Sequence, residues 1–174
     1  IEFIKNKSVA IVAPLPVETK SGAKIDSQDF ILRPGLSYHP KDLNPLIYGS
    51  RTDIGSLNVA GIQVSKGLSN NKLIVGKDIK YLIFRNLDNT ILKNFKFKIP
   101  VIKKRTLSGG DILSGINLNN VPQIVIFLLA SGVSKIYLYS MNFYMSSNIY
   151  LESYSSSLPT LHTLFYGDSL VAGH

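Results

Sequence analysis

The residues best suited to chemistry lie in the last third of the chain, in a polar loop that follows an apolar segment. The segment is Lys135–Tyr139, and the loop after it carries Tyr144 and Tyr150 and reaches His174. A histidine can act as a general base because its pKa lies near neutral pH. In open α/β sheets, ligands and reacting groups gather beyond the carboxyl ends of the strands. We therefore expect the functional site in this loop.

The chain has three histidines, and their surroundings differ. His39 lies in a Tyr-His-Pro turn and is expected on the surface, whereas His162 lies in a segment that could be helix or loop. A lone histidine is more often structural than catalytic. The choice of His174 as candidate base therefore depends on its context in the chain.

Short apolar segments bounded by turn residues predict the strands that must position this loop. Ser8–Val12 is rich in residues that favour strands, and it stops at Ala13–Pro16, whose two prolines cannot continue regular hydrogen bonding. Three further strands are expected at Asp29–Arg33, Leu57–Ala60 and Lys80–Phe84.

A helix is predicted over residues 119–131, followed directly by a strand. Its apolar residues recur at the spacing of a helix packed on a sheet, and they are Val121, Ile124, Val125, Leu128 and Leu129. Pro122 fits the first turn, Gly132 provides a C-terminal stop, and Lys135–Tyr139 is predicted as a buried strand. A helix followed by an apolar strand is half of a parallel βαβ unit. The predicted fold class is therefore α/β, with a Rossmann-like, mostly parallel sheet flanked by helices.

Length and composition suit one folded unit. The 174 residues are 45% hydrophobic and 17% charged, which is enough to bury one sizeable core. We expect a single domain over residues 1–174, either complete or a piece of a longer protein, because the chain begins at Ile1 without methionine. The lack of cysteine excludes disulfides and thiolate metal sites. No apolar run reaches the roughly 20 residues that cross a bilayer, which predicts a soluble or peripheral protein. The lack of cysteine fits a reducing compartment, and we expect a cytoplasmic protein, either free or peripheral to the inner membrane.

The net charge narrows the classes of molecule that the protein is expected to bind. Nineteen Lys and Arg residues against eleven Asp and Glu give a formal net charge of +8, which attracts phosphates, nucleotides, nucleic acids or anionic lipid headgroups. Lysines alternate with Phe95 and Phe97 across residues 93–98. This alternation is typical of the solvated face of a strand, and a phosphate-tracking or membrane-surface stripe is the alternative. No nucleic-acid-binding motif accompanies the charge, so we expect no nucleic-acid partner.

Several segments resemble sialyltransferases. Lys7–Ala13, Ser21–Arg33 and Tyr48–Asp53 resemble the long donor-binding motif of the animal-type enzymes, with its first strand, its "ID..DFV.R.N" strand and its "vG.kT" segment. The C-terminal third resembles bacterial sialyltransferases, in which a helix and a "G.K.IYL.G.DFY" strand precede a second tyrosine and a Gly-His pair. Here Tyr150 lies six residues after Tyr144, and His174 lies thirty residues after Tyr144, spacings that this family shares.

The resemblance implies an inverting, metal-independent glycosyltransferase with a GT-A-variant, sialyltransferase-like fold. Such an enzyme transfers sialic acid or a related acidic sugar from a CMP-activated donor to a glycan acceptor, and no cofactor is implied besides the donor. By position, His174 would take the proton from the acceptor hydroxyl. Tyr144 and Tyr150 would donate hydrogen bonds to the departing CMP phosphate, where negative charge develops and preorganised donors stabilise it.

Further donor-binding residues follow from the same resemblance. Asn58 matches a donor-binding asparagine, and Arg33 occupies the arginine position of the "ID..DFV.R.N" strand. Arg105, Ser108 and Gly109 resemble the family's "R.TSG" turn, in which backbone amides can approach a nucleotide closely. The pair Ser114-Gly115 lies closer to the predicted helix but lacks the arginine, so either pair could serve.

Three turns depart from the family pattern, and the first of them favours a second hypothesis. Ala13–Pro16 replaces a glycine–asparagine turn, Pro34-Gly35 stands where the family has another asparagine, and Met141-Asn142 replaces "G-D" or "G-F". A chain with these changes could be a catalytically silent module that binds a nucleotide or glycan within a polysaccharide-assembly protein. Tyr144 and Tyr150 would then be strand or interface aromatics.

The arginines also have a structural alternative. Arg33 and Arg51 could pair with Asp26, Asp29 or Asp53 instead of contacting a ligand.

Overall fold

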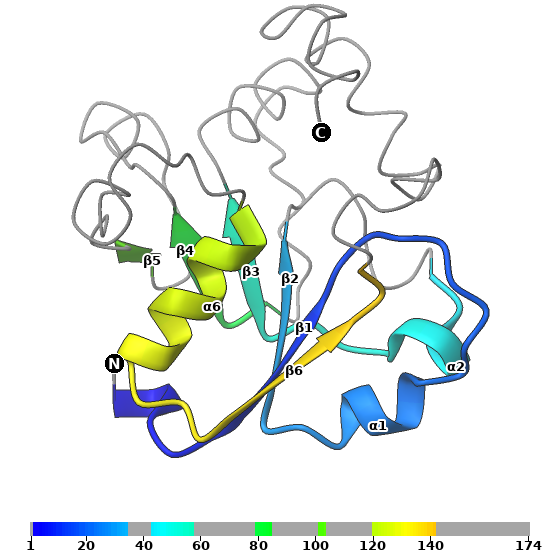
Figure 1. Cartoon of the computed structure of the whole chain (residues 1–174), viewed down its shortest axis with the longest axis horizontal. Helices are drawn as coiled ribbons and strands as arrows, with labels where there is room; N and C mark the ends of the chain where they lie inside the picture. The colour runs from blue at the N-terminus through cyan, green and yellow to red at the C-terminus, as the bar shows by residue number, and fades with distance from the viewer. Residues whose placement is uncertain (1, 35–42, 58–78, 85–100, 104–119, 142–174) are drawn as a thin grey trace, which may run out of the picture.

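The computed structural model describes residues 2–34, 43–57, 79–84, 101–103 and 120–141. In this part of the chain a parallel sheet carries helices on both of its faces (Figure 1). The predicted α/β fold with a parallel sheet flanked by helices is therefore confirmed for these residues.

The sheet formed by the described residues has six strands in the order β5-β4-β3-β2-β1-β6, and each neighbouring pair is parallel. The chain adds strands outward from β1 to β5 and then returns to place β6 on the other side of β1. The strand order thus reverses between β1 and β6, and α/β proteins bind ligands beyond the carboxyl ends at such a point. The strands are β1 (Ser8–Val12), β2 (Phe30–Pro34), β3 (Ile54–Leu57), β4 (Tyr81–Phe84), β5 (Val101–Lys103) and β6 (Lys135–Tyr139).

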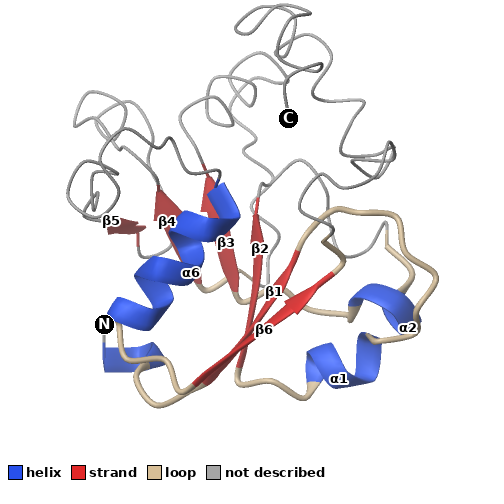
Figure 2. Ribbon diagram, viewed as in Figure 1, coloured by secondary structure: helices blue, strands red, loops and turns tan. Residues whose placement is uncertain are grey.

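The helices divide between the two faces of the sheet (Figure 2). One face is covered by α6, which contributes Ile124 and Leu128, and by the 3-10 turn η1, which contributes Ile4. The other face is covered by α1 and α2 through Ile25 and Tyr48. The helical segments are η1 (Glu2–Ile4), α1 (Gly22–Asp26), α2 (Pro45–Tyr48) and α6 (Asn120–Ala130).

Strand β1 is buried on both faces because it lies between these two layers. Val9 and Ile11 contact the α6 side, whereas Ala10 and Val12 contact the α1 and α2 side, and all four are 0% exposed. A strand buried on both faces needs a continuous apolar run, and the sequence supplies one at the predicted position.

Helix α6 is one residue shorter at each end than the helix predicted over residues 119–131, and its buried stripe agrees with the prediction except at one residue. Gly132 has φ +76°, and its amide donates to the carbonyl of Leu129 at 3.0 Å, which confirms the predicted stop. Leu129 was predicted in the buried stripe but is 60% exposed. Each residue turns a helix by roughly 100°, so Leu129 lies a quarter-turn or more from Leu128 and outside the contact with the sheet.

Several strand boundaries also differ from the prediction. β2 runs from Phe30 to Pro34, one residue later at each end than predicted, so Pro34 belongs to the strand and does not stop it. The Asp29 amide donates to the Ser8 hydroxyl at 3.1 Å. β4 begins at Tyr81 rather than Lys80. β3 begins at Ile54, three residues before the predicted start at Leu57, and residues 58–60 lie outside the described part. The elements α1, α2 and β5 were not predicted, since three to five residues are too few to show a period.

Strand β6 has the predicted bounds but not the predicted burial. It is parallel to β1, as expected for the second half of a βαβ unit, yet it lies at the edge of the sheet that the described residues form. Tyr137 and Leu138 are 37% and 44% exposed, so the prediction of a buried strand was wrong. Composition alone does not reveal the place of a strand in the sheet, because that place depends on the crossover that precedes it.

The amino ends of the central strands are joined by the buried carboxylate of Asp53. Its Oδ2 accepts hydrogen bonds from the Ile31 amide of β2 at 2.9 Å and from Arg51 Nε at 3.1 Å, and its Oδ1 accepts from Lys80 Nζ at 2.8 Å. Its main-chain carbonyl accepts from the amides of Lys80 and Tyr81. One residue thereby links β2, β3 and β4 at this end of the sheet.

Replacing Asp53 with alanine should lower the free energy of unfolding by about 2–3 kcal/mol, because the Ile31 amide loses its acceptor inside the protein. Urea denaturation followed by circular dichroism measures the change. Glu18→Ala, which removes an exposed carboxylate, is the matched control and should change stability by less than about 0.5 kcal/mol. Equal effects of the two variants would contradict this role for Asp53.

A second carboxylate joins the amino ends of β1 and β2. Asp29 Oδ2 accepts from the Ser8 amide at 2.8 Å and from the Ser8 hydroxyl at 2.9 Å, and Lys7 Nζ lies 3.9 Å from Oδ1. The Ser8 amide, followed by the Ser8 hydroxyl, holds the pKa of Asp29 below its ordinary value, with smaller help from Lys7 and Arg51.

Because this pKa is lowered in the folded state, ionised Asp29 stabilises the fold above the ordinary carboxylate pKa of about 4. That contribution is lost as the pH falls through the lowered pKa. The wild type should therefore be more stable than Asp29→Asn at neutral pH, and the difference should shrink in acid. Chemical denaturation at a series of pH values measures it, and a difference that grows in acid would refute the assignment.

Candidate functional site

The carboxyl ends of β1 and β6 lie side by side at the point where the strand order reverses. Val12 pairs with Tyr139, and the amide of Ala13 donates to the Tyr139 carbonyl at 3.0 Å, which extends the pairing by one residue. Beyond this point β1 continues into the buried residues 13–15, and β6 continues into the half-buried residues 140–141. These two segments form the described border of the candidate site.

The end of β6 presents a tyrosine and a turn. The ring of Tyr139 packs against the cluster that contains Ala10 and Val12. Burial, with a smaller effect from neighbouring Tyr137, raises the pKa of Tyr139. Ser140 follows with φ +54°, a left-handed conformation that is uncommon outside glycine and that turns the chain as it leaves the sheet.

The loop after β1 is fastened by Tyr48 of α2. The Tyr48 hydroxyl donates to the carbonyl of Leu15 at 3.1 Å and accepts from the amide of Val17 at 3.1 Å. The Tyr48 side chain is buried, with 5% of the residue exposed. A single phenol therefore holds both sides of Pro16.

Arg33 lies near the carboxyl end of β2, and its guanidinium points toward the segment that carries α2. Nε donates to Thr52 Oγ1 at 2.8 Å, and Nη2 donates to the carbonyls of Tyr48 at 2.6 Å and Arg51 at 3.3 Å. The residue is only 2% exposed. Hydrogen bonds of this kind offset the cost of burying a charge. They tie β2 to α2, and the donor-binding role of Arg33 stays a prediction.

The structural alternative for the arginines is confirmed for Arg51. Its Nε lies 3.1 Å from Asp53 Oδ2, and its Nη2 donates to the carbonyl of Gln28. Asp26 instead accepts from the amide and hydroxyl of Ser50, which joins the end of α1 to the residues after α2.

Most of the predicted site residues lie outside the described part of the chain. The catalytic candidate His174 is among them, as are the donor-binding candidates Tyr144, Tyr150, Asn58, Arg105, Ser108 and Gly109. Arg33 is the one predicted site residue that the structure describes. His39 and His162 also lie outside, as do the lysine–phenylalanine stretch at residues 93–98 and the pair Ser114-Gly115.

Tyr48 is the residue at this site that sequence reasoning missed. Its helix has a recognisable start, because Asn44 accepts a hydrogen bond from the Leu46 amide at 3.0 Å and Pro45 occupies the first turn. The Asn-Pro pair could have revealed α2. The contact of the Tyr48 phenol with a loop more than thirty residues earlier has no local signal.

Within the described ranges, no group of three or more His, Cys, Asp or Glu side chains could hold a metal ion. The helices in the same ranges are all too short or too polar to cross a membrane. In comparisons with known proteins, no family model matches the chain, and no curated protein matches it.

Replacing Arg33 with lysine should lower the free energy of unfolding by about 2 kcal/mol, because lysine lacks Nε and the planar fork that reach Thr52 and Tyr48 together. Thermal and urea denaturation measure the change. Arg51→Lys is the matched control and should cost less than about 1 kcal/mol, since the Arg51 side chain is 40% exposed and lysine can keep the ion pair with Asp53.

The same pair of variants distinguishes a structural role of Arg33 from a role in donor binding. Unchanged stability of Arg33→Lys together with weakened nucleotide binding would contradict the structural role. It would support the donor-binding role instead.

Proposed function

We propose that the chain is a glycosyltransferase domain of sialyltransferase type, with a GT-A-variant fold, working in the cytoplasm. It transfers sialic acid or a related acidic sugar from a CMP-activated donor to a glycan acceptor, with inversion and without a metal. The net charge of +8 suits an anionic nucleotide donor.

The pairing of β1 with β6 is the observation that carries this proposal. The two halves of the resemblance to sialyltransferases lie more than 100 residues apart in the sequence, one containing Ser8–Val12 and the other Lys135–Tyr139. In the fold these strands are parallel neighbours, with Val12 opposite Tyr139. The loops that would bind the donor and the acceptor therefore start from adjacent points at the switch of the strand order.

The proposed chemistry needs one base and two hydrogen-bond donors. His174 removes the proton from the acceptor hydroxyl as that oxygen attacks the anomeric carbon of the donor sugar. The bond between that carbon and the CMP phosphate breaks, and Tyr144 and Tyr150 donate hydrogen bonds to the phosphate oxygens as they gain charge. Phenols can stabilise this charge without a metal because they act as preorganised donors.

A silent binding module is the second candidate, and the loop after β1 favours it. Pro14 and Pro16 have no amide hydrogen, so this loop offers a phosphate fewer backbone donors than a glycine-rich turn does. Ala13, Pro14 and Leu15 are also buried. Such a module would bind CMP or a glycan and show no transfer.

Calorimetric titration with CMP, and with UMP and AMP as controls, tests the proposal at low and moderate salt. We expect selective binding of CMP that survives added salt, because base recognition does not depend on charge alone. Equal and weak binding of all three nucleotides that fades with salt would contradict a CMP site.

Transfer assays with CMP-sugars then separate the enzyme from the silent module. His174→Ala should keep donor affinity but lose turnover by roughly 100-fold or more, whereas the control His39→Ala should stay active. Tyr144→Phe and Tyr150→Phe should mainly lower turnover. Binding of CMP without any transfer would favour the silent module.

A further inference from the structure

The loop between β1 and α1, residues 13–21, leaves the sheet at the switch point but contains no glycine. Glycine lets a loop adopt left-handed backbone conformations and approach a ligand closely, and this loop lacks that freedom. It also makes no strand or helix in residues 13–21, so bonds to other elements must hold it in place.

In addition to the bond from the Ala13 amide to the Tyr139 carbonyl, two bonds to this loop come from a single hydroxyl. Tyr48 Oη donates to the carbonyl of Leu15 and accepts from the amide of Val17, each at 3.1 Å. The phenol thus donates one hydrogen bond and accepts one within the same loop, on either side of Pro16. Tyr48 is buried, so water has little access to these bonds. Hydrogen bonds of a buried group are expensive to break without replacement.

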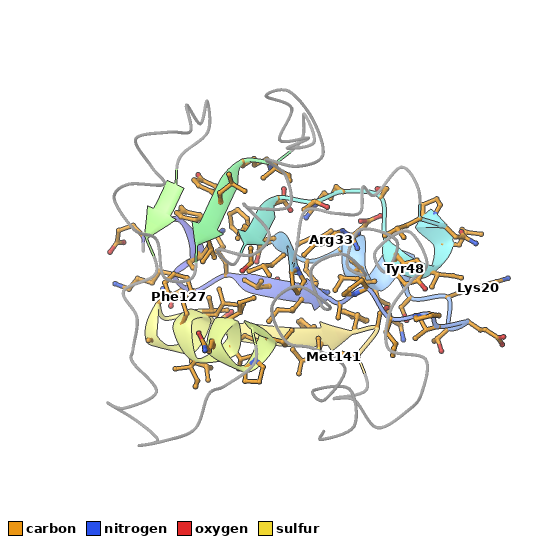
Figure 3. The ribbon with its side chains drawn as sticks, turned by 90° about the horizontal axis from the view of Figure 1, so that it is seen from above. Lys20, Arg33, Tyr48, Phe127 and Met141 are labelled. Atoms are coloured by element: carbon orange, nitrogen blue, oxygen red, sulfur yellow. The ribbon has the colours of Figure 1, made fainter. Side chains whose placement is uncertain are left out.

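The position of Tyr48 is itself held from two sides. Its main-chain carbonyl accepts from Arg33 Nη2 at 2.6 Å, a charge-assisted bond to the end of β2. On the other side α1 lies against α2 so closely that a Cβ on Gly22 would overlap the carbonyl oxygen of Pro45. Figure 3, which looks down on the carboxyl ends of β2, β3 and β4, shows Arg33 and Tyr48 together near α2 and away from Phe127 of α6.

We propose that Tyr48 is a positioning residue that holds the loop after β1 in one conformation, so that this loop forms a preformed wall of the CMP site. The choice of CMP as ligand rests on the proposed function, whereas the holding of the loop does not. A loop that is ordered before binding spares the ligand the entropy cost of ordering it. Pro14 and Pro16 already restrict the backbone of this loop, and the Tyr48 hydroxyl fixes the loop relative to α2.

Tyr48→Phe removes the hydroxyl and keeps the ring. Hydrogen exchange of the intact chain should show that the Val17 amide is protected in the wild type, although it lies outside any strand or helix, and exchanges at least about tenfold faster in the variant. The amides of Ile11 and Leu32 in the central strands should keep their protection. The affinity for CMP, measured by calorimetry, should fall by about three- to tenfold.

Tyr81→Phe is the matched control, because Tyr81 lies on the α6 side of the sheet, where its ring stacks on that of Phe3 with the ring centroids 3.8 Å apart. It should leave both Val17 exchange and CMP affinity unchanged. In Gly22→Ala, which presses on α2 from the other side, Val17 should also exchange faster than in the wild type.

Three outcomes would overturn the inference: an unprotected Val17 amide in the wild type, equal Val17 exchange in Tyr48→Phe and wild type, or faster exchange with unchanged CMP affinity. Uniformly faster exchange, including at Ile11 and Leu32, would count against it as well, since it means general destabilisation. If the wild type does not bind CMP, both the proposed function and the positioning role at a CMP site are contradicted. Val17 exchange then tests only whether Tyr48 holds the loop.

Discussion

The arrangement of the described residues depends on the complete enclosure of β1. This strand pairs with β2 along one edge and with β6 along the other, and it is covered by helices on both faces. Val9, Ala10, Ile11 and Val12 are all 0% exposed, and the polar residue Ser8 lies at the amino end of β1, so the rest of the strand presents no side chain to a ligand. Chemistry near β1 is therefore restricted to the ends of the strand, and the segments that follow β1 and β6 become the natural border of a site.

The two ends of the sheet differ in how they are held. At the amino ends, charged groups hold the strands, with Asp29 bonded to Ser8 and Asp53 bonded to Ile31, Arg51 and Lys80. At the carboxyl ends, neutral contacts of the Tyr48 phenol hold the loop after β1, and the buried Arg33 supports Tyr48 through its main chain.

The loop after β1 shows why a fold does not by itself establish a function. A parallel α/β sheet hosts many unrelated activities, and the residues proposed for catalysis lie outside the described part of the chain. The fold contributes the adjacency of β1 and β6. Because the Tyr48 phenol is buried and bonded within the loop, only the loop that it holds can present groups to a nucleotide at this border.

The sequence by itself determined the elements whose signal is local. The continuous apolar run of β1, the helical stripe of α6, the glycine stop at Gly132 and the bounds of β6 all follow from neighbouring residues, and the parallel α/β class follows from their order. Only the tertiary structure decided that β6 lies at the edge, that Leu129 is exposed, and that Arg33 and Tyr48 serve the loop after β1. The reason is physical: a period or a cap is set by residues within a few positions of one another, whereas strand order and buried hydrogen bonds join residues far apart in the chain, and they exist only once the layers have packed.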